Sequence, residues 1–364
     1  MSRQIAWLRE RFDVTAAGFD AAAIEGVNCV ELTPPPVRGG LRRKLGRIAT
    51  FYLGGADRFY WTNHRILHAC EQLQDRHFDL VIANDLEALP LGRRLAKQGR
   101  LLLDAHEYAP REYENFWTWR LINQPYVTRL CRLYLSQADA MTTICEGIAE
   151  EYARVFGIPK PGVITNAPAY LAELKPTPVD PGRIRIIHHG LAAPNRRLEL
   201  MIELMDRLDS RFELDLMLVT FNQNYLAGLK AAAAHQPRIR FREPVPLPEI
   251  VPVLNAYDIG LFLLPPLSFN SLMTLPNKFF EFVQARLATV IGPSPEMARL
   301  VKHYDCGLIA PDFEPASMAE LLNRLTPEQL SAYKLQSHRA AAELCAETNA
   351  EALLALVESL IHPH

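Results

Sequence analysis

The residues best suited to chemistry lie near the start of a predicted helix in the second half of the chain. The segment from Asp258 to Gly292 has the pattern of a buried strand, a polar loop, a helix and another strand. Thr274 is the expected N-cap and Pro276 suits the first turn, so free backbone N–H groups there could bind a pyrophosphate. Lys278 and Glu281 are three apart on one side of this helix. Lys278 would lie nearer the phosphates, and Glu281 could accept hydrogen bonds from a ribose diol.

The spacing of Lys278 and Glu281 leaves two interpretations open. Bonds from two hydroxyls to one carboxylate are charge-assisted, and losing them typically costs about 1.5–3 kcal/mol. The alternative is an i,i+3 ion pair on the protein surface, which contributes only about 0.2–0.5 kcal/mol.

The elements that must position these residues follow an alternating pattern. Short apolar runs alternate with longer amphipathic stretches, which indicates parallel sheets built from βαβ units. We therefore predict an α/β fold with two Rossmann-like domains, followed by a C-terminal helical segment. The expected parts are a first domain at 1–170, a linker at 171–183, a second domain at 184–326 and helices at 327–364.

The predicted strands give each domain a sheet. In the first half they are residues 13–17, 28–32, 80–83, 101–104, 140–143 and 162–165, and in the second half 184–188, 215–220, 239–241, 259–264 and 289–291. A helix precedes the first strand, whereas an α/β domain of this kind normally opens with a strand. Either the first strand is missing from the given sequence or the sheet has a shortened edge, and both interpretations stay open.

Composition excludes several classes of function. The chain of 364 residues carries 39 basic and 41 acidic residues, so it lacks the polybasic surface that nucleic-acid binding requires. Its six cysteines are scattered without a CxxC pair, which favours free thiols in a reducing compartment. No apolar run is long enough to cross a bilayer, and the N-terminus lacks the pattern of a secretory signal. We expect a cytoplasmic protein, in contact with the inner membrane face at most peripherally.

The segment around Glu281 resembles the nucleotide-sugar site of GT-B-fold glycosyltransferases of the family 4 type. The resemblance implies that the two domains face each other across a cleft, with the acceptor side at 1–170 and the nucleotide-sugar bound by 184–326. That family usually has a glutamate, seven residues, a second glutamate and then an Ala/Gly-Pro-Val-Ile stretch. Glu281 matches the second glutamate, and Ala288-Thr-Val-Ile-Gly292 matches the stretch after it. Met273 stands where the first glutamate is expected, so the chain resembles a variant that lacks it.

The resemblance extends to residues 184–208, which are similar to the family's strand, glycine loop and helix. It implies that Gly190 lets the chain turn close to the donor phosphate. Arg196 aligns with a lysine of the family and could clamp the β-phosphate bidentately, although a solvated charge at a helix start is the alternative. The donor-binding set implied by the resemblance is Gly190, Arg196, Asn277, Lys278 and Glu281.

A third similar segment lies in the first half. Residues 100–113 form a predicted buried strand that ends in Asp104-Ala-His106-Glu107. In the resembled family the histidine of a D-x-H-[DE] stretch lines the sugar pocket. A neutral imidazole there could hydrogen-bond the donor sugar or the reacting phosphate, although a histidine after a strand can also be structural. Together with Arg196 and Lys278, His106 makes up the predicted catalytic set.

Other residues invite a metal or membrane interpretation. His64 and His68 are four apart and His188 and His189 are adjacent, but neither pair has an evident third ligand, so we predict no metal site. Residues 116–134 mix aromatic side chains with three arginines. An interfacial helix has this composition, and so does a packed helix with a basic outer face.

The predicted activity is that of a hexosyltransferase-like, metal-independent glycosyltransferase without a cofactor. The resemblance implies a UDP- or GDP-linked sugar donor, a saccharide or lipid-linked acceptor, retention at the anomeric carbon, and a role in surface polysaccharide or glycolipid assembly. Two alternatives stay open. One is a catalytically silent GT-B protein that serves as a nucleotide-binding scaffold, and the other is a nucleotide-sugar epimerase.

Overall fold

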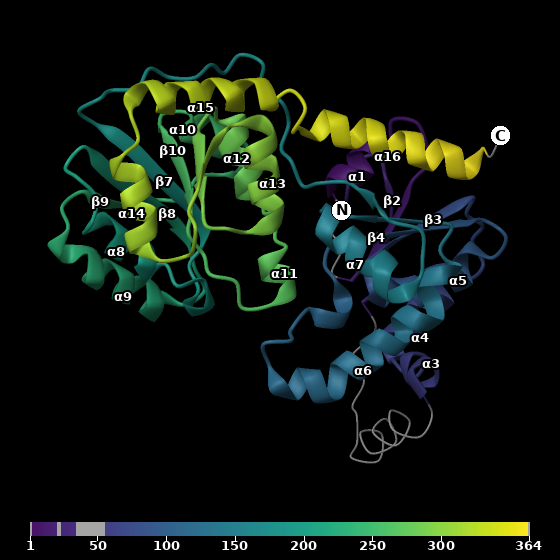
Figure 1. The fold of residues 1–364 in the computed structure, drawn as a ribbon. Coiled ribbons are helices and arrows are strands. Elements are labelled where there is room, and N and C mark those ends of the chain that lie inside the picture. Colours follow the sequence, from purple (N-terminus) through teal and green to yellow (C-terminus); the bar gives the residue numbers. More distant parts are fainter. Residues whose placement is uncertain (1, 20–22, 34–54, 363–364) are drawn as a thin grey trace. The chain divides into compact units, whose positions relative to one another are not determined.

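The computed structural model describes residues 2–19, 23–33 and 55–362, and divides into two compact units. Unit 1 comprises Met1–Ile164 and Ala350–His364, and unit 2 comprises Thr165–Asn349. Each unit contains a parallel sheet with helices on its faces, as predicted (Figure 1). The expected linker at 171–183 lies within unit 2.

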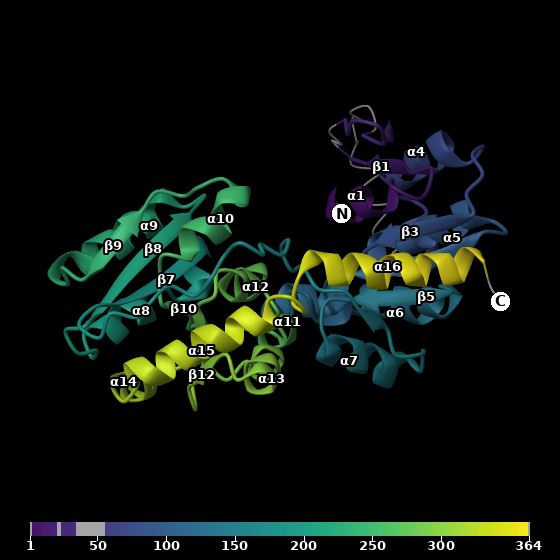
Figure 2. The same cartoon turned by 90° about the horizontal axis from the view of Figure 1, so that it is seen from above.

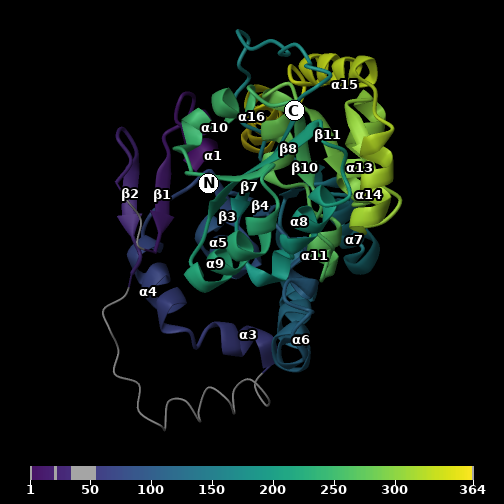
Figure 3. The ribbon, with the colours of Figure 1, turned by 90° about the vertical axis from the view of Figure 1, so that its left-hand side faces the viewer.

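Unit 1 has a larger and a smaller parallel sheet. The larger runs in the order β3-β4-β5-β6, and the smaller pairs β1 with β2 (Figure 3). The strands are β1 (Thr15–Gly18), β2 (Asn28–Glu31), β3 (Leu80–Asn84), β4 (Arg100–Ala105), β5 (Ala140–Thr143) and β6 (Gly162–Val163). The two early strands therefore exist as expected, but they pair with each other and not with the larger sheet.

Helices cover both faces of the larger sheet of unit 1. They are α1 (Ser2–Leu8), α3 (Gly55–Tyr60), α4 (His64–Leu73), α5 (Leu89–Ala96), α6 (Trp117–Tyr134), α7 (Glu146–Phe156) and α16 (Ala346–Ile361). On one face, Leu353 and Val357 of α16 pack with Leu8 and Leu102 (Figure 2). On the other, α5 packs against β3 and β4, where a β-carbon at Gly92 would lie 3.0 Å from the Leu101 side chain.

Unit 2 contains a six-stranded parallel sheet in the order β12-β11-β10-β7-β8-β9. Its strands are β7 (Ile184–Leu191), β8 (Phe212–Val219), β9 (Ile239–Arg242), β10 (Ile259–Phe262), β11 (Ala288–Ile291) and β12 (Gly307–Ile309). The sequence predicts all of them except the three-residue β12. The strand order reverses between β7 and β10, and ligands of open α/β sheets bind at the carboxyl ends of strands at such a point.

The helices of unit 2 lie on both faces of this sheet. They are α8 (Glu199–Met205), α9 (Gln223–Ala232), α10 (Leu247–Leu254), α11 (Phe269–Leu272), α12 (Asn277–Gln284), α13 (Pro295–Tyr304), α14 (Pro315–Asn323) and α15 (Pro327–Ala340). The predicted helical stretch at the C-terminus is two helices, α15 and α16, interrupted at residues 341–345. No helix among the described residues is long and apolar enough to cross a membrane.

Helix α12 lies unusually close to the sheet because Gly260 of β10 has no side chain. A β-carbon at Gly260 would lie 2.2 Å from the Phe282 ring, which no packed structure tolerates. Phe279, Phe280 and Phe282 are fully buried on this helix. The glycine thus sets the position of α12, and with it the positions of Lys278 and Glu281.

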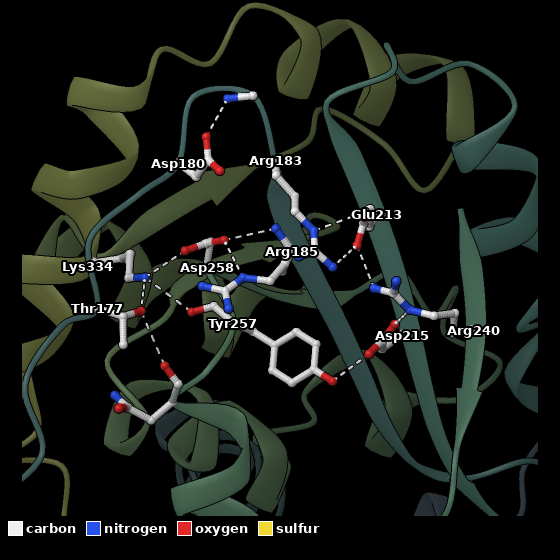
Figure 4. Close-up of polar contacts among 12 residues, drawn as sticks. Thr177, Asp180, Arg183, Arg185, Glu213, Asp215, Arg240, Tyr257, Asp258 and Lys334 are labelled. Atoms are coloured by element: carbon white, nitrogen blue, oxygen red, sulfur yellow. Dashed lines mark hydrogen bonds and ion pairs between the residues drawn. The ribbon is translucent and has the colours of Figure 1, made fainter. Parts of the chain in front are cut away.

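A buried ion pair fixes α15 to the sheet of unit 2 (Figure 4). Lys334 Nζ lies 2.9 Å from Asp258 Oδ1, and both side chains are at most 1% exposed. The ammonium also donates to the Tyr257 carbonyl and to Thr177 Oγ1, while Asp258 Oδ2 accepts from the Arg185 backbone N–H. Burial lowers the pKa of Lys334 and the Asp258 charge opposes this. Because every charged atom has a partner, removing one partner should be costly.

We expect Lys334→Met to destabilise the protein by about 3–5 kcal/mol, because it leaves the Asp258 carboxylate without its buried cation. Urea unfolding followed by circular dichroism measures the loss. The double variant Lys334→Met/Asp258→Asn should recover part of it. As a control, Arg324→Ala breaks an ion pair with Glu320 in which both side chains are more than 70% exposed, and should cost about 0–1 kcal/mol. A loss of the control's size in Lys334→Met would contradict the assigned role.

Candidate functional site

The carboxyl end of β7 and the start of α12 meet at the point where the strand order reverses. Gly190, near the end of β7, has φ +122°, and a β-carbon there would lie 2.9 Å from Lys278 Nζ. Any other residue would therefore be strained and would meet the ammonium group. Gly190 and Lys278, which are 88 positions apart in the sequence, are thus brought together.

The N-cap residue of helix α12 differs from the expected one. The predicted N-cap, Thr274, is wrong: Pro276 occupies that position with an extended backbone, and its carbonyl accepts from Phe279 N at 2.9 Å. The helix starts at Asn277 because the proline ring and its extended ψ end the loop there. No side chain caps this N-terminus. Its first N–H groups therefore remain available to an anion.

Lys278 is a buried cation with a neutral neighbour. It is 6% exposed, and its Nζ lies 3.3 Å from His188 Nε2. His188 Nδ1 lies 2.8 Å from the Leu261 carbonyl oxygen, which can only accept, so Nε2 is unprotonated and accepts from Lys278. Burial and the Lys278 charge hold the pKa of His188 well below its usual value.

Burial, helped by the nearby Arg196 charge and opposed by that of Glu281, lowers the pKa of Lys278 to about 7. Arg196 ends a short 3-10 turn, η4 (Pro194–Arg196), and is half-buried, which lowers its pKa. Within 2–19, 23–33 and 55–362, neither Arg196 nor Lys278 forms an ion pair at 4 Å or less. Two desolvated cations side by side are unfavourable unless an anion joins them.

Glu281 lies one turn further along α12 and is 8% exposed. Its Oε2 is 3.3 Å from His189 Nε2, but that ring nitrogen is not aligned for a hydrogen bond. Burial lowers the pKa of His189 to about 3, so the ring is neutral and the contact is not an ion pair. The surface ion-pair interpretation of Lys278 and Glu281 is wrong, since both residues are buried.

Met273, at the position of the missing glutamate, follows the one-turn helix α11. Ser268 and Ser271 form a capping box at the start of that helix. The turn is therefore stabilised by its own hydroxyls.

In unit 1, His106 follows β4 and lies between two carboxylates. Its Nδ1 is 3.3 Å from both oxygens of Asp85, and its Nε2 is 3.6 Å from Asp104 Oδ2. The contact with Asp85 raises the pKa of His106, burial opposes it, and Asp104 raises it further. This favours the charged ring, in contrast to the neutral imidazole expected from the sequence.

A cavity of about 660 Å³ on unit 2 contains none of the predicted donor residues. Its buried carboxylate, Asp215, accepts from Arg240 Nε at 2.9 Å and from the Tyr257 hydroxyl at 2.6 Å (Figure 4). It also accepts from Arg242 Nε at 2.7 Å. Because these charged groups satisfy one another, we assign the cluster to stabilising the edge of the sheet.

Residues 183–327 match the family described as Glycosyl transferases group 1. This segment is a group 1 glycosyltransferase domain. It runs from the start of β7 to the start of α15 and contains all five predicted donor residues. No curated protein matches the sequence.

Three solved structures share the fold of most of the chain at low sequence identity. Anabaena HepE in complex with UDP-glucose has a TM-score of 0.65 and 14% identity, covering 92% of this chain and 86% of that one. A UDP-forming trehalose-phosphate synthase from Burkholderia xenovorans has a TM-score of 0.65 and 14% identity, covering 96% and 94%. For TarM the values are 0.61 and 10%, and this chain spans only 58% of TarM. The GT-B fold is thereby confirmed.

The structure brings the predicted donor residues of unit 2 to one edge, around the end of β7 and the start of α12. His188 and His189 were considered only as metal ligands, yet they contact Lys278 and Glu281. No group of three His, Cys, Asp or Glu side chains suited to a metal occurs in the described part of the chain. The sequence feature that could have placed the two histidines in the site is their position directly before Gly190, at the end of a strand.

We expect the binding of a diphosphate to take up a proton when the pH is above about 7, because the anion favours the charged form of Lys278. Below that pH Lys278 is already charged. Above it, affinity should fall by up to about tenfold per pH unit. Calorimetry in two buffers of different ionisation enthalpy measures the uptake. Lys278→Met should bind weakly and without this dependence, and an unchanged dependence in that variant would assign the proton to another group.

Proposed function

We propose that the chain transfers a sugar from a nucleotide-sugar bound by unit 2 to a saccharide or lipid-linked acceptor bound by unit 1. The observation that supports this best is the pair of desolvated cations, Arg196 and Lys278, beside Gly190 and the uncapped start of α12. Together they form a binding place for a diphosphate. Glu281, one turn deeper, accepts hydrogen bonds from the ribose hydroxyls.

The roles of these groups in the reaction follow from the negative charge that develops on the donor phosphate. As the glycosidic bond of the donor breaks, its electron pair stays on the β-phosphate oxygen, which gains negative charge. Arg196, Lys278 and the α12 N–H groups are fixed before the reaction and stabilise that charge without reorganising. The transfer requires neither a metal nor a cofactor, and the departing phosphate helps to deprotonate the acceptor, with retention at the anomeric carbon.

UDP is the nucleotide we favour over GDP. HepE is described in complex with UDP-glucose and the trehalose-phosphate synthase as UDP-forming. Surface polysaccharide or glycolipid assembly in the cytoplasm is the role that fits such a donor and a lipid-linked acceptor.

Two other functions can be distinguished from the transferase by experiment. A catalytically silent scaffold binds the nucleotide without turnover, and Met273 in place of the first glutamate is the feature that favours it. An epimerase converts the nucleotide-sugar without an acceptor. The group 1 match favours the transferase over both.

We expect UDP to bind saturably in calorimetry, and Glu281→Ala to weaken it by about tenfold or more through loss of two charge-assisted hydrogen bonds. Glu203→Ala, an exposed glutamate on α8 of the same unit, is the matched control and should bind UDP like the wild type. GDP and ADP are titrated in parallel. A folded protein that binds none of the three nucleotides would contradict the donor site. Binding followed by sugar release only with an acceptor would exclude both alternatives.

The lipid-linked acceptor is supported by the exposed start of α6. Phe116, Trp117 and Leu121 are 56%, 65% and 68% exposed, an unusual concentration of apolar surface on one turn. Helix α6 also carries three arginines and no acidic residue. Aromatic and aliphatic side chains beside arginines are typical of a helix that lies at an anionic membrane surface. We therefore propose that this turn provides the peripheral membrane contact.

We expect the protein to sediment with vesicles that contain phosphatidylglycerol and much less with neutral phosphatidylcholine vesicles. The triple variant Phe116→Ala/Trp117→Ala/Leu121→Ala should reduce the bound fraction by about tenfold or more, since each side chain contributes about 1.5–3 kcal/mol when buried. Phe221→Ala, which removes a 99% exposed aromatic from unit 2, is the control and should change nothing. Equal binding by the triple variant would rule out this contact.

A further inference from the structure

Asp85, directly after β3, has a backbone conformation that a residue with a side chain rarely adopts. Its φ is +64° and its ψ 162°, a region used almost only by glycine. The strain does not serve to cap the following turn, because η1 (Leu86–Ala88) receives no side-chain hydrogen bond from Asp85. An aspartate in this place therefore needs another explanation.

Both oxygens of the Asp85 carboxylate interact with His106. Its Oδ1 accepts from the His106 backbone N–H at 2.9 Å, and both oxygens lie 3.3 Å from Nδ1 of the ring. The backbone N–H of Asp85 donates to the Asp104 carbonyl at 2.8 Å. These bonds fix the ring relative to the ends of β3 and β4.

Asp104 supports the opposite side of the ring. Its Oδ1 accepts from Thr142 Oγ1 at 2.7 Å and its Oδ2 from Gln4 Nε2 at 3.2 Å, which holds the carboxylate in place. At 3.6 Å from Oδ2, His106 Nε2 is too far for a hydrogen bond. The proton on Nε2 is therefore available to a ligand, and the His106 side chain is 32% exposed.

The same edge contains polar atoms that are buried and lack partners. Asn84 Oδ1 at the end of β3 and Thr143 Oγ1 at the end of β5 have no hydrogen bond within the described residues. Buried polar atoms are nearly always bonded, so such exceptions point to a missing ligand. They lie at the strand ends on either side of β4, which leads to His106.

We infer that Asp85 is a positioning residue that orients His106 as an imidazolium, whose Nε2–H is donated to an oxygen of the substrate. The inference rests on the proposed transfer reaction. Asp85 and Asp104 are the charged side chains of the described residues that stabilise this charge, and both raise the pKa of His106. Activity that needs the Nε2 proton is present at low pH and falls as the pH rises through that pKa.

The test compares Asp85→Ala with Asp85→Gly, because both lack the carboxylate but only glycine also relieves the strain. NMR titration of the His106 ring should give a lower pKa in both variants than in the wild type. Asp85→Gly should unfold at a Tm about 2–4 °C or more above that of Asp85→Ala. Asp139→Asn, which removes a carboxylate at the amino edge of the same sheet, is the control and should leave the His106 pKa unchanged.

The pH profile of transfer separates positioning from a structural role. In both Asp85 variants the loss of kcat/KM at high pH should begin at a lower pH than in the wild type. An unchanged His106 pKa, or a changed pKa with an unmoved profile, would overturn the inference. Absence of transfer in the wild type contradicts the proposed function instead, while the titration and the Tm difference still report on Asp85.

Discussion

The position of helix α12 depends on two places in the central strands of unit 2 where a β-carbon is missing. Gly260 lets the Phe282 ring lie against β10, and Gly190 leaves room for the Lys278 ammonium at the end of β7. Because α12 is rigid and buried, fixing its distance from the sheet also fixes the groups on its first two turns. A substitution at either glycine would therefore alter the site through the backbone, without touching a charged side chain.

Unit 2 buries positive charge in two different ways. Lys334 is compensated by Asp258 and by two further oxygens, so it stabilises the packing of α15. Lys278 and Arg196 have no carboxylate at ion-pair distance in the described part of the chain, and the Lys278 ammonium lies 3.3 Å from the neutral imidazole of His188. Desolvating cations without a partner costs stability, which a fold tolerates where a ligand supplies the opposite charge. The contrast separates the charges that support the fold from those that serve binding.

Much of this arrangement could be predicted from the sequence, because it depends on local patterns. Apolar runs located eleven of the twelve strands of the described residues, all except β12. The i,i+3 spacing of Lys278 and Glu281 placed both on one helix. The residues that sequence reasoning missed depend on contacts between distant segments. The tautomer of His188 is set by a carbonyl 73 positions away, and Asp85 contacts His106 across 21 positions. The N-cap of α12 was misplaced by two residues, because a proline can end a loop as well as begin a helix.

Each unit contains one cationic group whose pKa is shifted, and the two shifts have opposite directions and different causes. In unit 2, burial brings the pKa of Lys278 down to about 7, whereas in unit 1 two carboxylates raise the pKa of His106 from 6.5. Both groups therefore lose their positive charge as a solution becomes alkaline, but they respond differently to ligand. In the proposed function, a bound diphosphate would raise the Lys278 pKa again, so that the substrate itself would restore the charge. The charge on His106 is maintained by Asp85 and Asp104 before any substrate arrives, which explains why a strained aspartate stands where glycine would fit more easily.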